Sequence, residues 1–197
     1  MTFCTEQGFT QQLAMGTILQ GWGLAAQGQG DKGIAQMHQG LAASQAAGIG
    51  LGWAPVLAQM AEAYWHTGQT DEGLRLLAEA LAVVDRTGER WWEAEVHRLK
   101  GELLLAQEDT RRKWVEAEEC FRHALEVARH QQAKSMELRA AMSMSRLWQR
   151  QGRRAAAHHL LAEIYGWFTE GFDTVDLQEA KAWLEATWRS SSAASFN

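Results

Sequence analysis

Residues 53–86 read WAPVLAQMAEAYWHTGQTDEGLRLLAEALAVVDR. Apolar residues recur at helical spacing on both sides of Gly68, which predicts two helices, 53–67 and 70–86, joined by a tight turn. In the second helix, Gly73 is followed one and two turns later by Leu77 and Leu81. A helix of this kind can lie close to its neighbour, because glycine leaves room and the leucine one turn later fills the gap. The segment is therefore predicted to be a helical hairpin.

The same order of small and bulky residues recurs along the chain. The four sets are Gly33, Met37, Leu41; Gly73, Leu77, Leu81; Ala117, Phe121, Leu125; and Ala157, Leu161, Tyr165. Their first members lie 40, 44 and 40 residues apart. A glycine turn precedes three of the sets, at Gly28, Gly68 and Gly152, whereas the polar stretch 107–113 precedes the third and predicts a longer loop. The sequence therefore predicts four tandem helical hairpins.

A ninth helix is expected after the hairpins. The predicted helices span 7–27, 31–47, 53–67, 70–86, 90–107, 111–130, 133–151, 153–166 and 174–188. The last of them has an apolar stripe that could cover the open end of a helical array. The stripe consists of Val175, Leu177, Ala180, Trp183 and Leu184. The tail 190–197 is polar and without periodicity, so we expect it to be disordered.

The composition agrees with an all-helical protein. The 197 residues are 46% hydrophobic and include one proline. The net charge of −5 argues against a nucleic-acid partner. No apolar run approaches the ~20 residues of a membrane span, so no membrane association is expected. Cys4 and Cys120 are too far apart in sequence to indicate a disulfide framework or a metal site, which favours a reducing, cytoplasmic location.

Motifs for catalysis or cofactor binding are missing from the sequence. Gly28, Gly30 and Gly33 spell GxGxxG, but they follow a predicted helix rather than a strand, and no acidic residue follows at the required distance. His158 and His159 are adjacent on a predicted helix and lack the i, i+4 spacing of a zinc site. Neither cysteine has a matching nucleophile signature. We therefore expect no enzyme activity, no cofactor and no metal.

The first 60 residues are poor in charge. They contain Glu6, Asp31 and Lys32 as their charged residues and hold 11 of the 18 glycines. This part of the chain could pack against earlier repeats of a longer protein or against a second copy of itself. Alternatively, it is a loosely packed edge of the array. The sequence leaves both readings open.

The hairpins resemble tetratricopeptide repeats (TPRs). The positions that carry the resemblance are Ala61, Tyr64, Gly68, Gly73, Leu77 and Ala80, which match the small, aromatic, glycine, small, bulky and small positions of that family. The period is about six residues longer than the 34 usual for the family, and the closing proline is missing. The resemblance implies an all-α, right-handed solenoid domain over residues 1–189. Its repeats would span about 7–47, 53–86, 90–130 and 133–166, followed by the capping helix.

The resemblance also implies a binding surface. TPR proteins bind ligands through the first helix of each hairpin, and the matching residues here are Trp22, Glu62, Trp65, His66, Arg98, Glu102, Arg146, Gln149 and Arg150. Tryptophan supplies contact area and arginine can hold a carboxylate with two hydrogen bonds, so the expected partner is a peptide or helix with acidic side chains. The alternative is a small-molecule sensor with an apolar pocket lined by Trp22, Trp65 and Met60.

Two longer motifs resemble a more specific group. They are GERWWEAEVHRLKGELLL at 88–105 and YGWFTEGFDTVDLQEAKAWLE at 165–185. Both are similar to the C-terminal repeat region of bacterial regulatory proteins that join a nucleotide cyclase domain and a signalling ATPase to TPRs. This resemblance implies a noncatalytic scaffolding or regulatory module of a bacterial signalling system, and it transfers no cyclase or nucleotide site to this chain.

Overall fold

The computed structural model describes residues 10–47, 53–107 and 110–194, and the regular secondary structure in these residues is helical throughout. The helices are α2 (Thr10–Ala26), α3 (Gly30–Ala46), α4 (Trp53–His66), α5 (Thr70–Thr87), α6 (Glu93–Gln107), α7 (Arg111–His130), α8 (Lys134–Arg150), α9 (Arg154–Tyr165) and α10 (Val175–Ala194). In the described part of the chain, no helix is both long enough and apolar enough to cross a membrane.

Most of the helix limits lie within three residues of those expected. The first expected helix began at residue 7, which lies outside the described residues, as does the end of the expected disordered tail, 195–197. Trp91 and Trp92 form a turn before α6 instead of opening the helix. The last helix continues to Ala194, six residues beyond the expected end.

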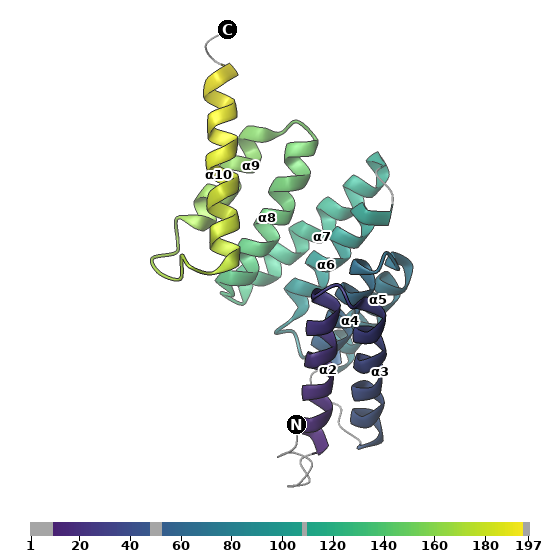
Figure 1. Cartoon of the computed structure of the whole chain (residues 1–197). Coiled ribbons are helices and arrows are strands. Elements are labelled where there is room, and N and C mark those ends of the chain that lie inside the picture. The colour runs from purple at the N-terminus through teal and green to yellow at the C-terminus, as the bar shows by residue number, and fades with distance from the viewer. Residues whose placement is uncertain (1–9, 48–52, 108–109, 195–197) are drawn as a thin grey trace. The chain divides into compact units, whose positions relative to one another are not determined.

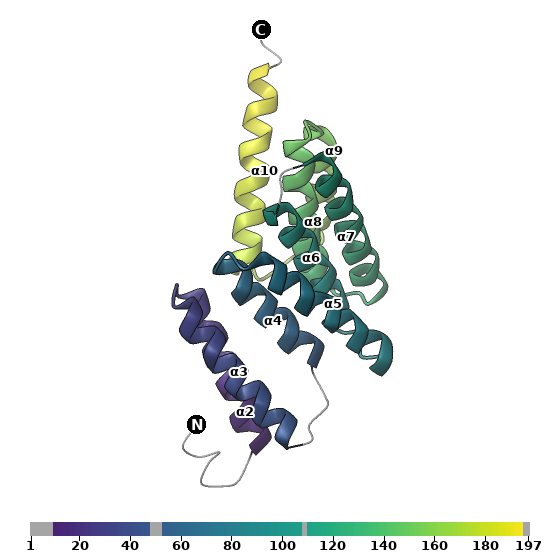
Figure 2. The ribbon, with the colours of Figure 1, turned by 90° about the vertical axis from the view of Figure 1, so that its right-hand side faces the viewer.

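The chain forms two compact units, Met1–Leu99 and Lys100–Asn197, and their boundary falls within α6. In the first unit α2 pairs with α3 and α4 pairs with α5, and α4 also packs on α2 and α3. Figures 1 and 2 both show α2 and α3 side by side. In the second unit α7 packs on α8, α8 packs on α9, and α10 packs on both α9 and α8. Each unit is therefore built from helices that neighbour one another in sequence.

The first two residues of each repeated set of small and bulky residues lie in the core. The first two members of all four sets are buried, namely Gly33, Met37, Gly73, Leu77, Ala117, Phe121, Ala157 and Leu161. Gly101 faces the ring of Phe121 so closely that a Cβ at position 101 would collide with it. Small residues thus bring each pair of helices together and bulky residues fill the space beside them, which confirms the packing expected from the repeat.

Glycine turns join the two helices of three hairpins, where the sequence predicted them. Gly28, Gly68 and Gly152 have φ angles of 82°, 77° and 80°. This left-handed backbone conformation is strained for other residues and ends a helix sharply. The GxGxxG spelling at Gly28–Gly33 is therefore a hairpin turn between two helices.

Three of the four extra residues of the third repeat lie in the helix 111–130, whose limits are those expected, which corrects the expected longer loop. Three positions separate α6 from α7, as they do α4 from α5. Instead, α7 begins six residues before Ala117, whereas α5 begins three residues before Gly73. The Thr110 side chain caps this additional turn by accepting a hydrogen bond from the Lys113 amide at 3.3 Å. Pairs of Arg112 and Lys113 with Glu116 join successive turns, so residues 111–113 favour helix over loop.

Candidate partner-binding surface

In the first unit, the structure brings together two of the predicted binding residues from different hairpins. The indole Nε1 of Trp22 on α2 donates a hydrogen bond to the Glu62 carboxylate on α4, at 2.9 Å. The two residues are 40 positions apart, one repeat period, and they therefore occupy equivalent places in successive hairpins. Trp22 is 37% exposed, so much of the indole remains available for contact.

Trp65 and His66 extend this surface along α4. Trp65 lies three residues after Glu62, which places both on one side of the helix. The rings of Trp65 and His66 are stacked, with centroids 5.6 Å apart and an angle of 12° between the planes. Trp65 is half-buried and His66 is exposed. Trp22, Glu62, Trp65 and His66, which we call the first-unit surface, combine aromatic area with one carboxylate.

Arg98 is held inside the protein. It is 8% exposed and donates from Nε and Nη2 to the two carboxylate oxygens of Glu95, at 2.9 and 2.7 Å. Glu95 is also buried, and the pair lies within one helix at i, i+3 spacing. Because separating a buried ion pair leaves uncompensated charges, this guanidinium is poorly placed to meet a carboxylate of a partner. In the second unit, Glu102 accepts a hydrogen bond from the Ser143 hydroxyl at 2.5 Å.

Two of the predicted residues on α8 are in contact with the last helix of the chain. Arg146 Nη2 donates to Glu179 Oε2 at 2.9 Å, and Trp183 Nε1 donates to Gln149 Oε1 at 3.0 Å. Glu179 and Trp183 are four residues apart on α10 and so share one face of it. This side of α8 therefore holds a helix that presents a carboxylate and an aromatic ring one turn apart.

Arg150, the ninth predicted residue, also lies on α8. Its guanidinium is 5.5 Å from the ring centroid of Trp114 on α7, within cation–π range. Arg146 and Arg150 are both exposed. The Arg146–Glu179 pair is about half exposed on both sides, and pairs of this kind contribute only about 0–1 kcal/mol. The Arg146–Glu179 pair therefore holds α10 only weakly.

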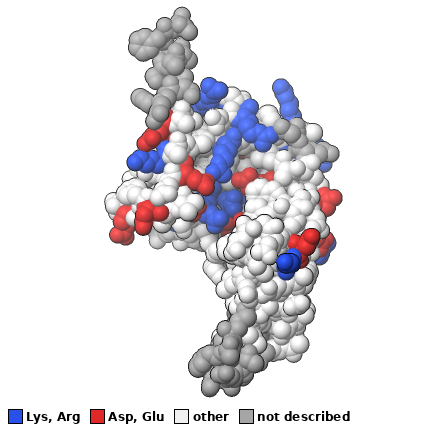
Figure 3. All heavy atoms as spheres, in the orientation of Figure 1, with Lys and Arg blue, Asp and Glu red and all other residues white. Residues whose placement is uncertain are grey.

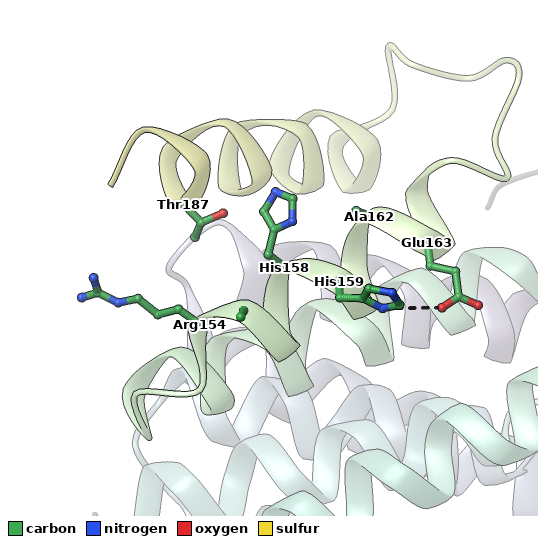
Figure 4. Close-up of a pocket in the computed structure, with 7 residues that line it drawn as sticks. Arg154, His158, His159, Ala162, Glu163 and Thr187 are labelled. Carbon is green, nitrogen blue, oxygen red and sulfur yellow. Dashed lines mark ion pairs between the residues drawn. The ribbon is translucent and has the colours of Figure 1, made fainter. Parts of the chain in front are cut away.

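The sequence did not indicate a groove between α9 and α10 of about 780 Å³ (Figure 4). Its lining residues are Arg154, Ala155, His158, His159, Ala162, Glu163 and Thr187. His159 Nδ1 lies 4.0 Å from Glu163 Oε2, one turn further along α9. The adjacent histidines were visible in the sequence, but the groove depends on how α10 packs. The two histidines in the sequence therefore did not predict the groove.

A smaller groove of about 270 Å³ lies in the first unit. It is lined by Gln45, Trp53, Leu57, Glu79, Val83 and Arg86. Neither groove is lined by Trp22, Trp65 or Met60, the residues expected around a small-molecule pocket. Met60 is 1% exposed and belongs to the core, while Trp22 faces outward.

The chain has a TPR-like helical repeat fold. It is similar to two crystal structures of the nearly identical TPR-like repeats of a kinesin light chain-like protein from Podosopora anserina. The first, a variant, has a TM-score of 0.67 and 14% identity, and the match covers 93% of this chain and 88% of that chain. The second has a TM-score of 0.66 and 14% identity, with coverage of 93% and 89%. The sequence matches no protein-family model and no curated protein.

The all-helical, TPR-like fold expected from the sequence is thus confirmed. TPR-like repeats generally mediate protein–protein interaction and are typically noncatalytic. The particular residues, partner and biological setting are considered below.

Proposed function

We propose that this chain is a noncatalytic interaction module with two candidate surfaces for a peptide or helix, each within one unit: the first-unit surface, and the exposed side of α8 in the second unit. The observation that supports it most directly is the engagement of Arg146 and Gln149 by Glu179 and Trp183 of α10. Arg146 and Gln149 contact a helix of the same chain, which supports the proposal that this side of α8 suits a helical partner. The TPR-like fold supports protein partners in general.

The side chains favour a partner that combines aromatic or aliphatic residues with carboxylates. Trp22 and Trp65 offer apolar area, and His66 adds a hydrogen-bonding edge beside them. Arg146 and Arg150 are the exposed cations of the predicted set, since Arg98 is held by Glu95. The preference for acidic side chains is therefore proposed for α8 rather than for α6.

Selection from a displayed random peptide library, using the whole chain as bait, tests this proposal. Selected peptides should bind the double variant Trp22→Ala/Trp65→Ala at least about tenfold more weakly than the wild type, because tryptophans often dominate the binding energy of an interface. Trp91→Ala is the matched control, because Trp91 is 56% exposed but lies outside the predicted set. Equal affinity for the wild type and the Trp22/Trp65 variant would reject the first-unit surface. Selected peptides without carboxylates would reject the acidic preference.

Self-association through the first unit is a further part of the proposal. Met15, Leu19 and Trp22 are 37%, 47% and 37% exposed and lie on one side of α2 at i, i+4 and i+7. Figure 3 shows the surface over α2 and α3 as almost free of charged side chains. Sedimentation velocity should show a dimer that Leu19→Glu dissociates, because the variant places charge in the apolar face. A wild-type monomer at all concentrations would contradict this.

We place the module in the cytoplasm as part of a bacterial signalling or regulatory system. The support for this setting is the resemblance of 88–105 and 165–185 to the repeat region of cyclase–ATPase regulatory proteins. Genomic and transcript sequence around the coding region would show whether the reading frame continues upstream into an ATPase.

A further inference from the structure

The loop between α9 and α10, residues 166–174, exposes an unusual amount of apolar surface. Trp167 and Phe172 in the loop are 58% and 46% exposed, and Val175 at the start of α10 is 68% exposed. Three of the eight large hydrophobic side chains that are exposed in the described chain thus fall within nine residues. Apolar side chains concentrated in this way mark interaction sites more often than scattered ones do. We call Trp167, Phe172 and Val175 the loop apolar set.

The backbone of this loop is held by its own hydrogen bonds. The Trp167 amide donates to the Ile164 carbonyl at 3.3 Å, and the Thr174 amide and hydroxyl both donate to the Gly171 carbonyl, at 2.9 and 2.7 Å. Gly171 has a φ of 76°, which permits the reversal of the chain. The Gln178 side chain donates back to the Asp173 carbonyl at 3.2 Å. The loop is therefore fixed in shape although its apolar side chains face solvent.

The aromatic rings of the loop are also held in place. Trp167 packs edge-to-face on Phe168, with centroids 5.3 Å apart, and its ring lies 5.4 Å from the Lys134 ammonium. Phe172 packs against Tyr165, with centroids 5.9 Å apart. Rings that are already ordered lose little conformational freedom on binding, so more of their contact energy is available for affinity.

The charges of the loop indicate which partner fits. Residues 166–176 contain Glu170, Asp173 and Asp176 and no lysine or arginine. Arg139 compensates Asp176 at 3.8 Å, and Lys134 beside the Trp167 ring is compensated by Glu137 at 2.7 Å. Glu170 and Asp173 are exposed and pair with no cation of the described chain. Figure 3 shows acidic side chains gathered at the left edge of the molecule, where Figure 1 places this loop. A second copy would bring like charges together, and an anionic membrane surface would be repelled.

We propose that the α9–α10 loop is a further docking site, distinct from the first-unit surface and from the exposed side of α8, which binds a basic amphipathic peptide segment. Aliphatic side chains of the segment cover the loop apolar set, and lysine or arginine side chains meet Glu170 and Asp173. The apolar contact supplies affinity, and the charges set the orientation and the association rate.

Fluorescence anisotropy with a labelled synthetic Leu/Lys amphipathic peptide tests the proposal on the full chain. The Leu/Lys peptide should bind at least about tenfold more tightly than a matched Leu/Glu peptide. Trp167→Ala/Phe172→Ala should weaken binding at least about tenfold, since both rings are truncated. Glu170→Gln/Asp173→Asn should weaken binding and reduce its dependence on salt. Circular dichroism establishes that each variant is folded.

Two control variants separate the loop from general attraction to an acidic protein. Val115→Ala truncates an apolar side chain that is 59% exposed on α7, and Glu119→Gln/Glu126→Gln removes two exposed carboxylates from the same helix. Neither variant should change the affinity for the Leu/Lys peptide more than about twofold, because these residues lie outside the proposed interface. Equal binding of Leu/Lys and Leu/Glu peptides, or of wild type and Trp167→Ala/Phe172→Ala, would overturn the proposal. A loop-dependent dimer in sedimentation, or loop-dependent binding to phosphatidylcholine/phosphatidylserine vesicles, would overturn it in favour of that other occupant.

Discussion

The backbones of Gly21 on α2 and Gly33 on α3 lie directly against each other. A Cβ placed on Gly33 would be 2.5 Å from the Gly21 carbonyl oxygen, and one placed on Gly21 would be 2.6 Å from the Gly33 carbonyl oxygen. Such distances can be relieved only by moving a helix, because the opposing atoms belong to the backbone. The closeness of the first hairpin therefore depends on two glycines that are 12 residues apart in sequence.

Gly33→Ala should destabilise the first hairpin. The added methyl would meet the Gly21 carbonyl and the Ala25 amide, and overpacking of this kind costs about 1–3 kcal/mol. Gly23→Ala is the control, because a Cβ there meets nothing within 4 Å. In the control the gain in helix propensity should stabilise by about 0.5–1 kcal/mol. Urea unfolding measures the stability of both variants. If Gly33→Ala changed stability as Gly23→Ala does, the α2–α3 contact would not be as close as described.

Ala117→Trp should disrupt the packing of α7 in the second unit. Ala117 is fully buried, so an indole has no space without displacing neighbours, and the cost should be at least about 1–3 kcal/mol. Val115→Trp, on the same helix but 59% exposed, should change stability by less than about 0.5 kcal/mol. Thermal unfolding compares the two variants. An unchanged melting temperature for Ala117→Trp would contradict the close packing of α7 at Ala117.

The Glu137 carboxylate should make stability depend on pH. Arg129 Nε and Lys134 Nζ donate to its two oxygens at 2.8 and 2.7 Å. Burial opposes ionisation of Glu137, but the hydrogen bonds from Lys134 and Arg129 outweigh it and lower its pKa below the ordinary 4.5. Because the folded-state pKa is lowered, the stabilisation is present above pH 4.5 and is lost as pH falls through the folded value.

Glu137→Gln should therefore cost about 1–2 kcal/mol at neutral pH and flatten the acid limb of the stability curve. Urea unfolding at a series of pH values measures this. Glu126→Gln is the control, since that side chain is 78% exposed, and its curve should follow the wild type. An acid limb for Glu137→Gln as steep as that of the wild type would show that other carboxyls cause the dependence.

Trp183→Ala should loosen α10 from α8. The change removes an indole that is half-buried and its hydrogen bond to Gln149, so amide exchange in α10 should accelerate by about tenfold or more. Arg146→Ala removes only a half-exposed ion pair and should change exchange by less than about fivefold. Hydrogen–deuterium exchange followed by mass spectrometry measures both. A larger effect of Arg146→Ala would reverse the roles assigned to the two contacts.

The sequence predicted the helical hairpins well because their signals are local. Small residues such as Gly33 and Ala117 recur in register with bulky ones, and glycines such as Gly68 mark turns that need a left-handed backbone. In the third repeat the helix 111–130 was predicted correctly, but the extra length was assigned to a loop, because a polar stretch is compatible with either a loop or an exposed helical turn. Its outcome depended on the Thr110 cap and on pairs made by Arg112 and Lys113 with Glu116.

The predicted binding residues divide according to what surrounds each of them. Trp22 and Glu62 meet as successive repeats would place them. Arg98 pairs with Glu95 inside the protein, and Arg146 pairs with Glu179 of α10. Matching a residue to a binding position of the TPR family predicts its helix and the approximate face of that helix. Adjacent residues of a helix point about 100° apart, so an error of one residue in the alignment can turn a side chain from solvent to core.

The sequence by itself determined the helices, their turns and the small residues at their seams, because hydrogen bonding within a helix and its apolar period are properties of neighbouring residues. Only the tertiary structure decided which polar side chains are already occupied and which apolar ones stay exposed. Both depend on residues that approach from other helices, as Trp183 approaches Gln149, and no local pattern records that approach.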